Sequence, residues 1–253
     1  MTDTGASGIR LVIGASRGIG LALAEAQLGD PAVRKVLATC RPASRRQGLE
    51  RLARVHGDRL QSIDLDVTDS ESLRSFGAQL DRLDGSVDLA IHAAGLLHDE
   101  GMQPEKSLAD CDRRNLLRLF EVNSIGPLMV ARELLRAAGR RPLKFAALSA
   151  MVGSITDNRL GGWYGYRASK AALNQLLKTL ALECRIRHPR ATILAIHPGT
   201  TDTDLSRPFQ RNVAPGKLYS PAQSAARILA VVHSCSVADN GRFLNWDGSE
   251  IPW

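Results

Sequence analysis

A glycine-rich turn between a short apolar run and a helix-forming segment is the feature that most constrains this fold. Ile9–Ile13 reads IRLVI, is bounded by glycine, and suits a buried strand. GASRGIG follows directly over residues 14–20 and leads into the alanine- and leucine-rich residues 21–28. In this order, backbone N–H groups and a helix N-terminus face a bound pyrophosphate, and glycine is needed where a Cβ would block the approach. The turn therefore predicts a nucleotide site.

The rest of the chain repeats this alternation of strand and helix. Further apolar runs suited to strands occupy residues 35–39, 60–65, 87–91, 143–148, 191–197 and 242–245. Helical patterns occupy residues 49–55, 70–83, 111–139, 166–187 and 220–234. This alternation predicts a doubly wound, mostly parallel sheet with right-handed crossovers and helices on both faces. No repeat, low-complexity tract or linker divides residues 1–253, so we expect one α/β domain.

Composition narrows the class of protein. Hydrophobic residues make up 44% of the chain, and no apolar run approaches the ~20 residues of a membrane span, so we expect a soluble protein. The first residues, MTDTGASG, lack an export signal, which predicts a cytoplasmic location. The four cysteines form no CxxC and the six histidines show no paired spacing, so we expect reduced thiols and no metal site.

The net charge of +7 raises the question of nucleic-acid binding. The arginines are scattered, without a long basic block or interleaved aromatic residues, so we expect no nucleic-acid partner. The alternative would show a steep salt dependence of DNA affinity. A modest positive field also suits an anionic dinucleotide or an acidic substrate.

The end of the second predicted strand indicates which dinucleotide is bound. An acidic side chain near this point would bind the adenosine ribose and favour NAD, but the strand ends at Cys40-Arg41. Arg41, and Arg17 in the glycine turn, are instead placed to meet a 2′-phosphate. NADP(H) is therefore favoured over NAD(H), the alternative being that either arginine merely faces solvent.

Tyr166 and Lys170 lie in the stretch WYGYRASKAALN, residues 163–174. Four residues apart on a helix, their side chains share one face, whereas Tyr164 has no such partner. An ammonium beside a phenol favours the phenolate, so we expect the pKa of Tyr166 to fall toward the working range of an acid/base catalyst. The alternative is an ordinary surface pair on an amphipathic helix.

Three further segments surround this stretch. Residues 96–110 form a polar insertion after the fourth strand, where ligands bind in such sheets, and residues 200–219 suit a mobile flap over a site. Asn123 lies within a predicted helix that Pro127 should bend. The expected pocket lining consists of Leu96, Leu97, His98, Trp163 and residues of the flap.

Six motifs in register resemble the short-chain dehydrogenase/reductase family, a Rossmann-fold family, over essentially the whole chain. They are GASRGIG, Asp66-Val67, Ala93-Ala94-Gly95, Asn123, YRASK and PGTTDT at residues 198–203. The chain is most similar to the carbonyl-reductase-like and C-factor-like branch, including its ending, FLNWDGSEIPW. The resemblance implies dimers or tetramers formed through helices 111–139 and 166–187.

The resemblance also implies roles for single residues. Tyr166 would donate a proton to a carbonyl oxygen, Lys170 would depress the pKa of that tyrosine and hold the nicotinamide ribose, and Asn123 would anchor a water. Asp66 would contact the adenine, and Pro198, Gly199 and Thr203 would fix the nicotinamide carboxamide. The implied cofactor-binding residues are Gly14, Ser16, Arg17, Gly18, Ile19, Gly20, Arg41, Asp66, Val67, Ala93, Ala94, Gly95, Tyr166, Lys170, Pro198, Gly199, Thr201 and Thr203.

The chain departs from the family pattern in three places. Ile13 stands where many members have threonine, and His92-Ala93 replaces an asparagine pair that usually ties neighbouring strands together. Ala150 occupies the position of the serine that orients the carbonyl. Ser149 is one residue earlier and would point to the other side of an extended strand, so it can replace that serine only at a bulge or turn. Ser154 is the second candidate.

Taken together, the sequence predicts a cytoplasmic, NADPH-dependent reductase of ketones or aldehydes, with Tyr166, Lys170, Asn123 and Ser149 as its catalytic residues. A second hypothesis is a sensor or signalling protein that binds NADP(H) and turns over little. A sensor has no need of Tyr166 and Lys170 at the catalytic spacing.

Overall fold

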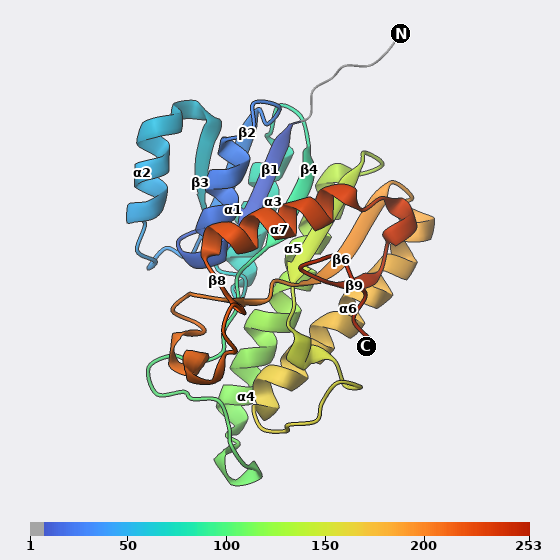
Figure 1. Cartoon of the computed structure of the whole chain (residues 1–253). Helices are drawn as coiled ribbons and strands as arrows, with labels where there is room; N and C mark the ends of the chain where they lie inside the picture. The colour runs from blue at the N-terminus through green and yellow to red at the C-terminus, as the bar shows by residue number, and fades with distance from the viewer. Residues whose placement is uncertain (1–7) are drawn as a thin grey trace.

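The computed structural model describes residues 8–253 and contains a central parallel sheet between two layers of helices (Figure 1). Seven strands run in the order β3-β2-β1-β4-β5-β6-β9, and every neighbouring pair is parallel. They are β1 (Ile9–Ile13), β2 (Lys35–Cys40), β3 (Leu60–Asp64), β4 (Val87–His92), β5 (Leu143–Leu148), β6 (Ala191–His197) and β9 (Arg242–Asn245). The expected doubly wound α/β fold is confirmed.

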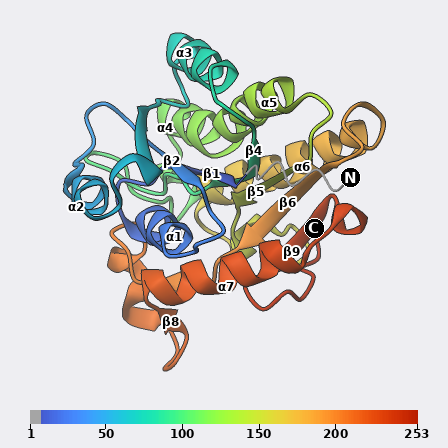
Figure 2. The same ribbon diagram turned by 90° about the horizontal axis from the view of Figure 1, so that it is seen from above.

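The helices divide between the two faces of the sheet (Figure 2). They are α1 (Gly18–Leu28), α2 (Gln47–His56), α3 (Ser70–Asp81), α4 (Arg113–Phe120), α5 (Gly126–Ala138), α6 (Tyr164–Arg187) and α7 (Pro221–Ser234). Apolar residues of α3, α5 and α6 form one buried cluster, and those of α1, α2 and α7 form the other. Within β1, Leu11 belongs to the first cluster and Val12 to the second, because successive side chains of a strand point to opposite faces.

The strand order places the candidate site. From β1 the chain moves outward through β2 and β3, and then returns to β4 on the other side of β1. The crossovers therefore diverge between the carboxyl ends of β1 and β4, which is where doubly wound sheets bind ligands. The glycine turn follows β1 there, and residues 93–95 follow β4.

The expected long helix over residues 111–139 is a composite in the structure. It begins at Arg113, where the side chain of Asp112 caps the first turn by accepting the N–H of Asn115 at 3.0 Å. A π-helical turn over Glu121–Ile125 joins α4 to α5, and Pro127 lies in the first turn of α5, directly after the π turn. Asn123 thus lies in a π turn, a geometry that local periodicity does not reveal.

Residues 1–7, on which the expected absence of an export signal rests, lie outside the described part of the chain. Between Gly8 and Trp253, none of the helices combines the length and the apolar character that crossing a bilayer requires.

His92 is fully buried at the end of β4. Its Nε2 atom has no hydrogen-bond partner among residues 8–253. Burial and the nearby Lys170 ammonium lower the pKa of His92 to about 3. The folded protein therefore holds a neutral imidazole where members of the family that the sequence resembles usually have an asparagine.

We expect His92→Asn to reduce the acid sensitivity of the fold. As pH falls below about 6.5, the unfolded chain binds a proton at His92 and the folded chain does not. The free energy of unfolding therefore falls. At pH 5 this loss is about 2 kcal/mol for one such histidine. Urea unfolding at pH 7 and pH 5 measures it in both proteins. His197, whose pKa burial lowers to about 4, is common to both. An equal pH dependence in both proteins would contradict the prediction.

Candidate active site

The glycine turn is held in place by contacts that leave no room for side chains. Gly14 has φ +80°, and a Cβ there would lie 2.7 Å from the Cα of Ala94 after β4. A Cβ on Gly20 would lie 2.1 Å from the carbonyl oxygen of Gly14. The N–H groups of Gly14 and Ala15 both donate to the carbonyl of Thr39, at 3.1 and 2.8 Å. The turn is therefore tied to β2 and packed against the end of β4.

The first turn of α1 has donors available for an anion. The N-cap residue is Arg17, and its side chain makes no capping hydrogen bond. No acidic residue lies in the first turn to accept the N–H groups there. The amides of Gly18, Ile19 and Gly20 are thus left for a ligand, as a pyrophosphate site requires. A Cβ on Gly18 would lie 3.2 Å from Cγ2 of Thr203, so the turn faces the segment after β6. This cradle fits the diphosphate of a dinucleotide.

Several arginines surround the expected adenosine end of the site, in different electrostatic states. Arg46 is paired with Asp64 at the end of β3. Arg17 reaches Asp204 at 2.7 Å, and both side chains are exposed. Arg41, which follows β2, is exposed and forms no ion pair with any residue between 8 and 253. Arg41 therefore presents an unneutralised positive charge beside the glycine turn.

The other predicted cofactor positions lie along the same edge of the sheet. The carboxylate of Asp66, just after β3, accepts the N–H and the hydroxyl of Thr68, at 2.9 and 2.7 Å. The N–H of Ala93 donates to the carbonyl of Ile13 at 2.8 Å, which extends the β1–β4 pairing by one residue. Val67 is buried beside the π turn. These contacts set the shape of the edge between β3 and β4.

Residues 198–203 form a closely packed turn after β6. Gly199 has φ +76°, and a Cβ there would lie 3.1 Å from the ring of Tyr219. The hydroxyl of Thr201 bonds that of Ser224 on α7 at 2.7 Å. The turn is therefore anchored to the body of the protein before the chain enters the predicted flap.

Tyr166 and Lys170 lie at the carboxyl end of β5, on the first turns of α6. Tyr166 is 8% exposed and Lys170 is 3% exposed. The ammonium of Lys170 donates to the carbonyl of Leu148 at 2.8 Å and lies 5.8 Å from the centroid of the Tyr166 ring. The predicted shared face is confirmed by this geometry, whereas Tyr164 points into solvent.

The expected lowering of the Tyr166 pKa is wrong for this structure. Burial raises the pKa of Tyr166 to about 12 and lowers that of Lys170 to about 8. The physical reason is that the ammonium is directed at the carbonyl of Leu148, while the phenolate would have to be buried without a partner. The phenol is therefore protonated at neutral pH, which is the form a proton donor needs.

Asn123 connects the edge of the sheet to the helix that carries Tyr166. Its side-chain amide accepts the N–H of Leu96 at 2.8 Å and donates to the carbonyl of Leu96 at 2.7 Å. It also donates to the hydroxyl of Ser169 at 3.0 Å, and that hydroxyl donates to the carbonyl of Tyr166 at 2.9 Å. Asn123 thus fixes the insertion after β4 relative to α6.

The two candidate serines have different partners. The hydroxyl of Ser149 donates to the Oδ1 atom of Asn174 at 2.6 Å, so its one proton is engaged inside the protein. The amide of Asn174 in turn donates to the carbonyl of Gly153 at 3.3 Å. Ser154 is 1% exposed and accepts the N–H of Asp157 at 3.2 Å. Sequence reasoning missed Asn174, although its position one turn beyond Lys170 on the same helix face was a usable signal.

Aromatic rings form one wall beside Tyr166. Ring centroids lie 6.2 Å apart for Trp163 and Tyr166, 4.9 Å for Trp163 and Phe209, and 5.6 Å for Phe209 and His98. The Nε2 atom of His98 lies 3.1 Å from the carbonyl of Leu205. The predicted flap therefore packs over the start of α6, through the 3₁₀ turn Arg207–Asn212 between the short strands β7 (Thr200–Thr201) and β8 (Leu218–Tyr219). Its mobility remains a prediction.

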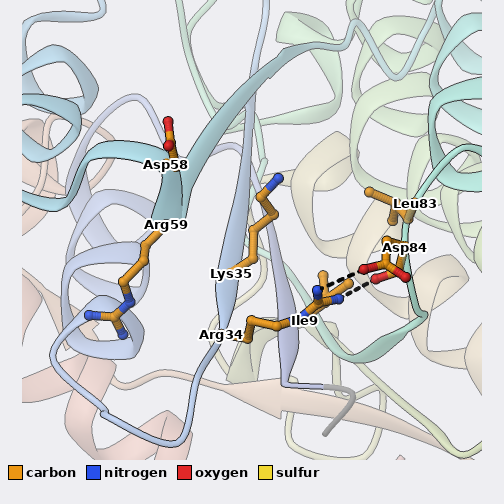
Figure 3. Close-up of a pocket in the computed structure, with 7 residues that line it drawn as sticks. All are labelled: Ile9, Arg34, Lys35, Asp58, Arg59, Leu83 and Asp84. Atoms are coloured by element: carbon orange, nitrogen blue, oxygen red, sulfur yellow. Dashed lines mark hydrogen bonds and ion pairs between the residues drawn. The ribbon is translucent and has the colours of Figure 1, made fainter. Parts of the chain in front are cut away.

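A cavity lies at the other end of the sheet from the candidate active site (Figure 3). It is lined by Ile9, Arg34, Lys35, Asp58, Arg59, Leu83 and Asp84. Ile9 and Lys35 begin β1 and β2, so this cavity is at the amino ends of the strands, away from Tyr166. Arg34 and Asp84 form an ion pair there. Its position separates it from the candidate active site.

Within residues 8–253, no three His, Cys, Asp or Glu side chains are grouped so that they could hold a metal ion.

Comparison with known proteins identifies the family. A family model described as short chain dehydrogenase matches residues 9–214. The chain belongs to the short-chain dehydrogenase family. It is 31% identical to the short chain dehydrogenase gsfK of Penicillium aethiopicum, over 96% of this chain and 98% of that protein. It is 32% identical to C-signal of Myxococcus xanthus, over 67% of this chain and 94% of that protein.

Solved structures place this short-chain dehydrogenase in the carbonyl-reductase-like branch. The NADPH-bound carbonyl reductase from chicken fatty liver superposes with a TM-score of 0.85 and 29% identity, covering 97% of this chain and 94% of that one. A carbonyl reductase from Pseudomonas aeruginosa PAO1 in complex with NADP superposes with a TM-score of 0.77 and 29% identity, covering 97% and 99%. The chain is therefore an NAD(P)-dependent oxidoreductase of the short-chain dehydrogenase type.

We expect Ser149→Ala to lower the free energy of unfolding by about 1–3 kcal/mol, because it leaves the Oδ1 atom of Asn174 buried without a donor. Urea unfolding measures this loss, and Ser154→Ala is the matched variant. An unchanged stability would contradict the prediction. Comparing kcat of the two folded variants assigns the role of the missing serine: the variant with the larger loss of kcat has lost the group that orients the carbonyl.

Proposed function

We propose that this protein reduces a ketone or an aldehyde to an alcohol with NADPH, in a reaction that is reversible in principle. The observation that carries the proposal is a buried, protonated phenol at Tyr166, one helical turn from a buried ammonium at Lys170, at the sheet edge that also holds the glycine turn. The NADPH and NADP bound to the two carbonyl reductases of similar structure support it.

In the proposed reaction, Tyr166 donates its phenolic proton to the carbonyl oxygen. When bound, NADPH supplies the hydride. Lys170, with a pKa of about 8, is charged at neutral pH; it stabilises the phenolate that forms and holds the nicotinamide ribose. Asn123 anchors a water that returns a proton to Tyr166. Ser149 orients the carbonyl, which requires its hydroxyl to exchange Asn174 for the substrate.

The wall of aromatic rings beside Tyr166 favours a pocket that is mostly apolar with one polar edge. Trp163 and Phe209 contribute apolar ring faces beside Tyr166, and His98 contributes a polar edge. A substrate with an apolar body and one carbonyl group would bury its apolar part against these rings and direct the oxygen to the phenol.

We further propose that the protein acts in the cytoplasm and assembles as a dimer or tetramer.

We expect Arg41→Ala to weaken NADPH binding about 10- to 100-fold, because it removes a charge-assisted bond to the 2′-phosphate. NADH, which lacks that phosphate, should bind equally well to both proteins. Isothermal titration with each cofactor measures the difference. Arg54→Ala, which removes the same charge from the exposed side of α2, is the control. An equal loss of NADH and NADPH affinity would contradict a 2′-phosphate contact at Arg41.

A second candidate function is a sensor that binds NADP(H) and turns over little. The likeness to C-signal and the alanine at position 150 support it. Tight NADPH binding without NADPH oxidation across a broad panel of aldehydes, ketones and diketones would favour the sensor over the reductase.

We expect Tyr166→Phe to lower kcat for carbonyl reduction by at least about 10²-fold, because it removes the proton donor. Its NADPH affinity should stay close to that of the wild type. Steady-state NADPH oxidation and cofactor titration measure the two quantities. Tyr164→Phe, which changes an exposed tyrosine on the same helical turn, is the control and should reduce carbonyls normally. Retained turnover in Tyr166→Phe would exclude the proposed role.

A further inference from the structure

Glu105 is a buried acid that the proposed reaction does not use. It lies in the insertion after β4, and only 4% of its surface is exposed. A carboxylate at such a position requires compensating hydrogen bonds, because burial removes the water that would solvate it. Its partners therefore show what it stabilises.

Glu105 bonds the start of α6 twice. Its backbone carbonyl accepts the N–H of Trp163 at 2.6 Å, and its carboxylate accepts the N–H of Gly165 at 3.2 Å. Trp163 is the N-cap residue of α6, and its own side chain makes no capping hydrogen bond. Glu105 thus supplies the cap from 60 residues earlier in the chain. Its negative charge also faces the positive end of the helix dipole.

The backbone that Glu105 holds is strained. Trp163 has φ 51° and ψ 45°, and among residues 8–253 it is the one non-glycine residue with a positive φ. A left-handed conformation is unfavourable for such a residue and persists only where its surroundings enforce it. A Cβ on Gly165 would lie 2.8 Å from the carboxylate of Glu105, so the glycine is what allows this close approach.

The strained residue is also the centre of the aromatic wall. The Trp163 ring lies between Tyr166 and Phe209, with centroids at 6.2 and 4.9 Å. Its direction follows from its backbone angles. A turn that relaxed to right-handed angles would move the ring away from both neighbours.

We propose that Glu105 is a positioning residue for this site: by holding Trp163 in the left-handed turn, it sets the wall against which the substrate is aligned with Tyr166. This role rests on the proposed reductase function. Glu105 acts through Trp163 and the first turn of α6, and does not touch the reacting atoms.

Three variants distinguish the effect of losing the side-chain hydrogen bond from that of losing the charge alone and from that of a substitution elsewhere in the insertion. Glu105→Ala removes the carboxylate that accepts the N–H of Gly165 and keeps the backbone carbonyl that accepts the N–H of Trp163. Glu105→Gln keeps a side-chain acceptor oxygen without the charge, and Glu100→Ala removes an exposed acid of the same insertion. Should the alanine variant not fold, Glu105→Asp, whose carboxylate is one methylene shorter, replaces it with the same expected direction.

In kinetics, we expect Glu105→Ala to lower kcat/KM about 10- to 100-fold, because small misplacements at an active site have effects of this size. NADPH affinity should be unchanged. Glu105→Gln should recover most of the loss, and Glu100→Ala should match the wild type. An alanine variant with normal kcat/KM would overturn the proposal, and so would one that loses NADPH affinity in proportion to activity.

Fluorine NMR of protein labelled with 5-fluorotryptophan tests the positioning without any turnover. The three tryptophans give one resonance each, and Trp163→Phe assigns the one concerned. We expect Glu105→Ala to shift the Trp163 resonance and to leave those of Trp246 and Trp253 in place. An unmoved Trp163 resonance, or equal movement of all three, would overturn the proposal. A wild type that reduces no carbonyl would instead contradict the proposed function, while the spectrum still decides the role of Glu105.

Discussion

The candidate site depends on one buried charge, the ammonium of Lys170, and on the carbonyl of Leu148 that accepts its hydrogen bond. A buried ammonium is stable only where acceptors are fixed around it, and here the acceptor is the last residue of β5. The surrounding backbone packs closely against the Lys170 side chain. A Cβ on Gly153 would lie 2.9 Å from the Cβ of Lys170, and one on Gly95 would lie 3.7 Å from its Nζ atom. The end of the sheet, the following loop and α6 are therefore adjusted to one side chain, and this places Tyr166 one turn away.

Long-range hydrogen bonds hold α6 at this edge. Asn123 joins the insertion to Ser169, and Ser149 joins the end of β5 to Asn174. Together with Glu105 at its beginning, these bonds bind successive turns of the helix to different parts of the protein. Buried amide and hydroxyl groups in such networks orient their neighbours as well as stabilise them. The direction of the Tyr166 phenol is thus a property of the whole edge of the sheet.

The segment over the site is attached in two different ways. Near its start, Thr201 is bonded to α7 inside the protein, and further along Phe209 packs on Trp163. Between these points, Asp204 meets Arg17 in an exposed ion pair, which contributes at most about 1 kcal/mol. A firmly anchored base and weaker contacts over the site are what an opening flap requires.

Local sequence determined the alternation of strands and helices, the glycine turn and the shared face of Tyr166 and Lys170. These features follow from spacing along one element, and all of them are present in the structure. The tertiary structure alone decided the rest. The π turn at Asn123 depends on packing against α6, and the partner of Ser149 on how β5 meets α6. The raised pKa of Tyr166 is opposite to the sequence-based expectation, because burial is a property of the assembled fold and spacing cannot reveal it. For the same reason, no local signal marks Glu105, whose carboxylate bonds Gly165, 60 residues away along the chain.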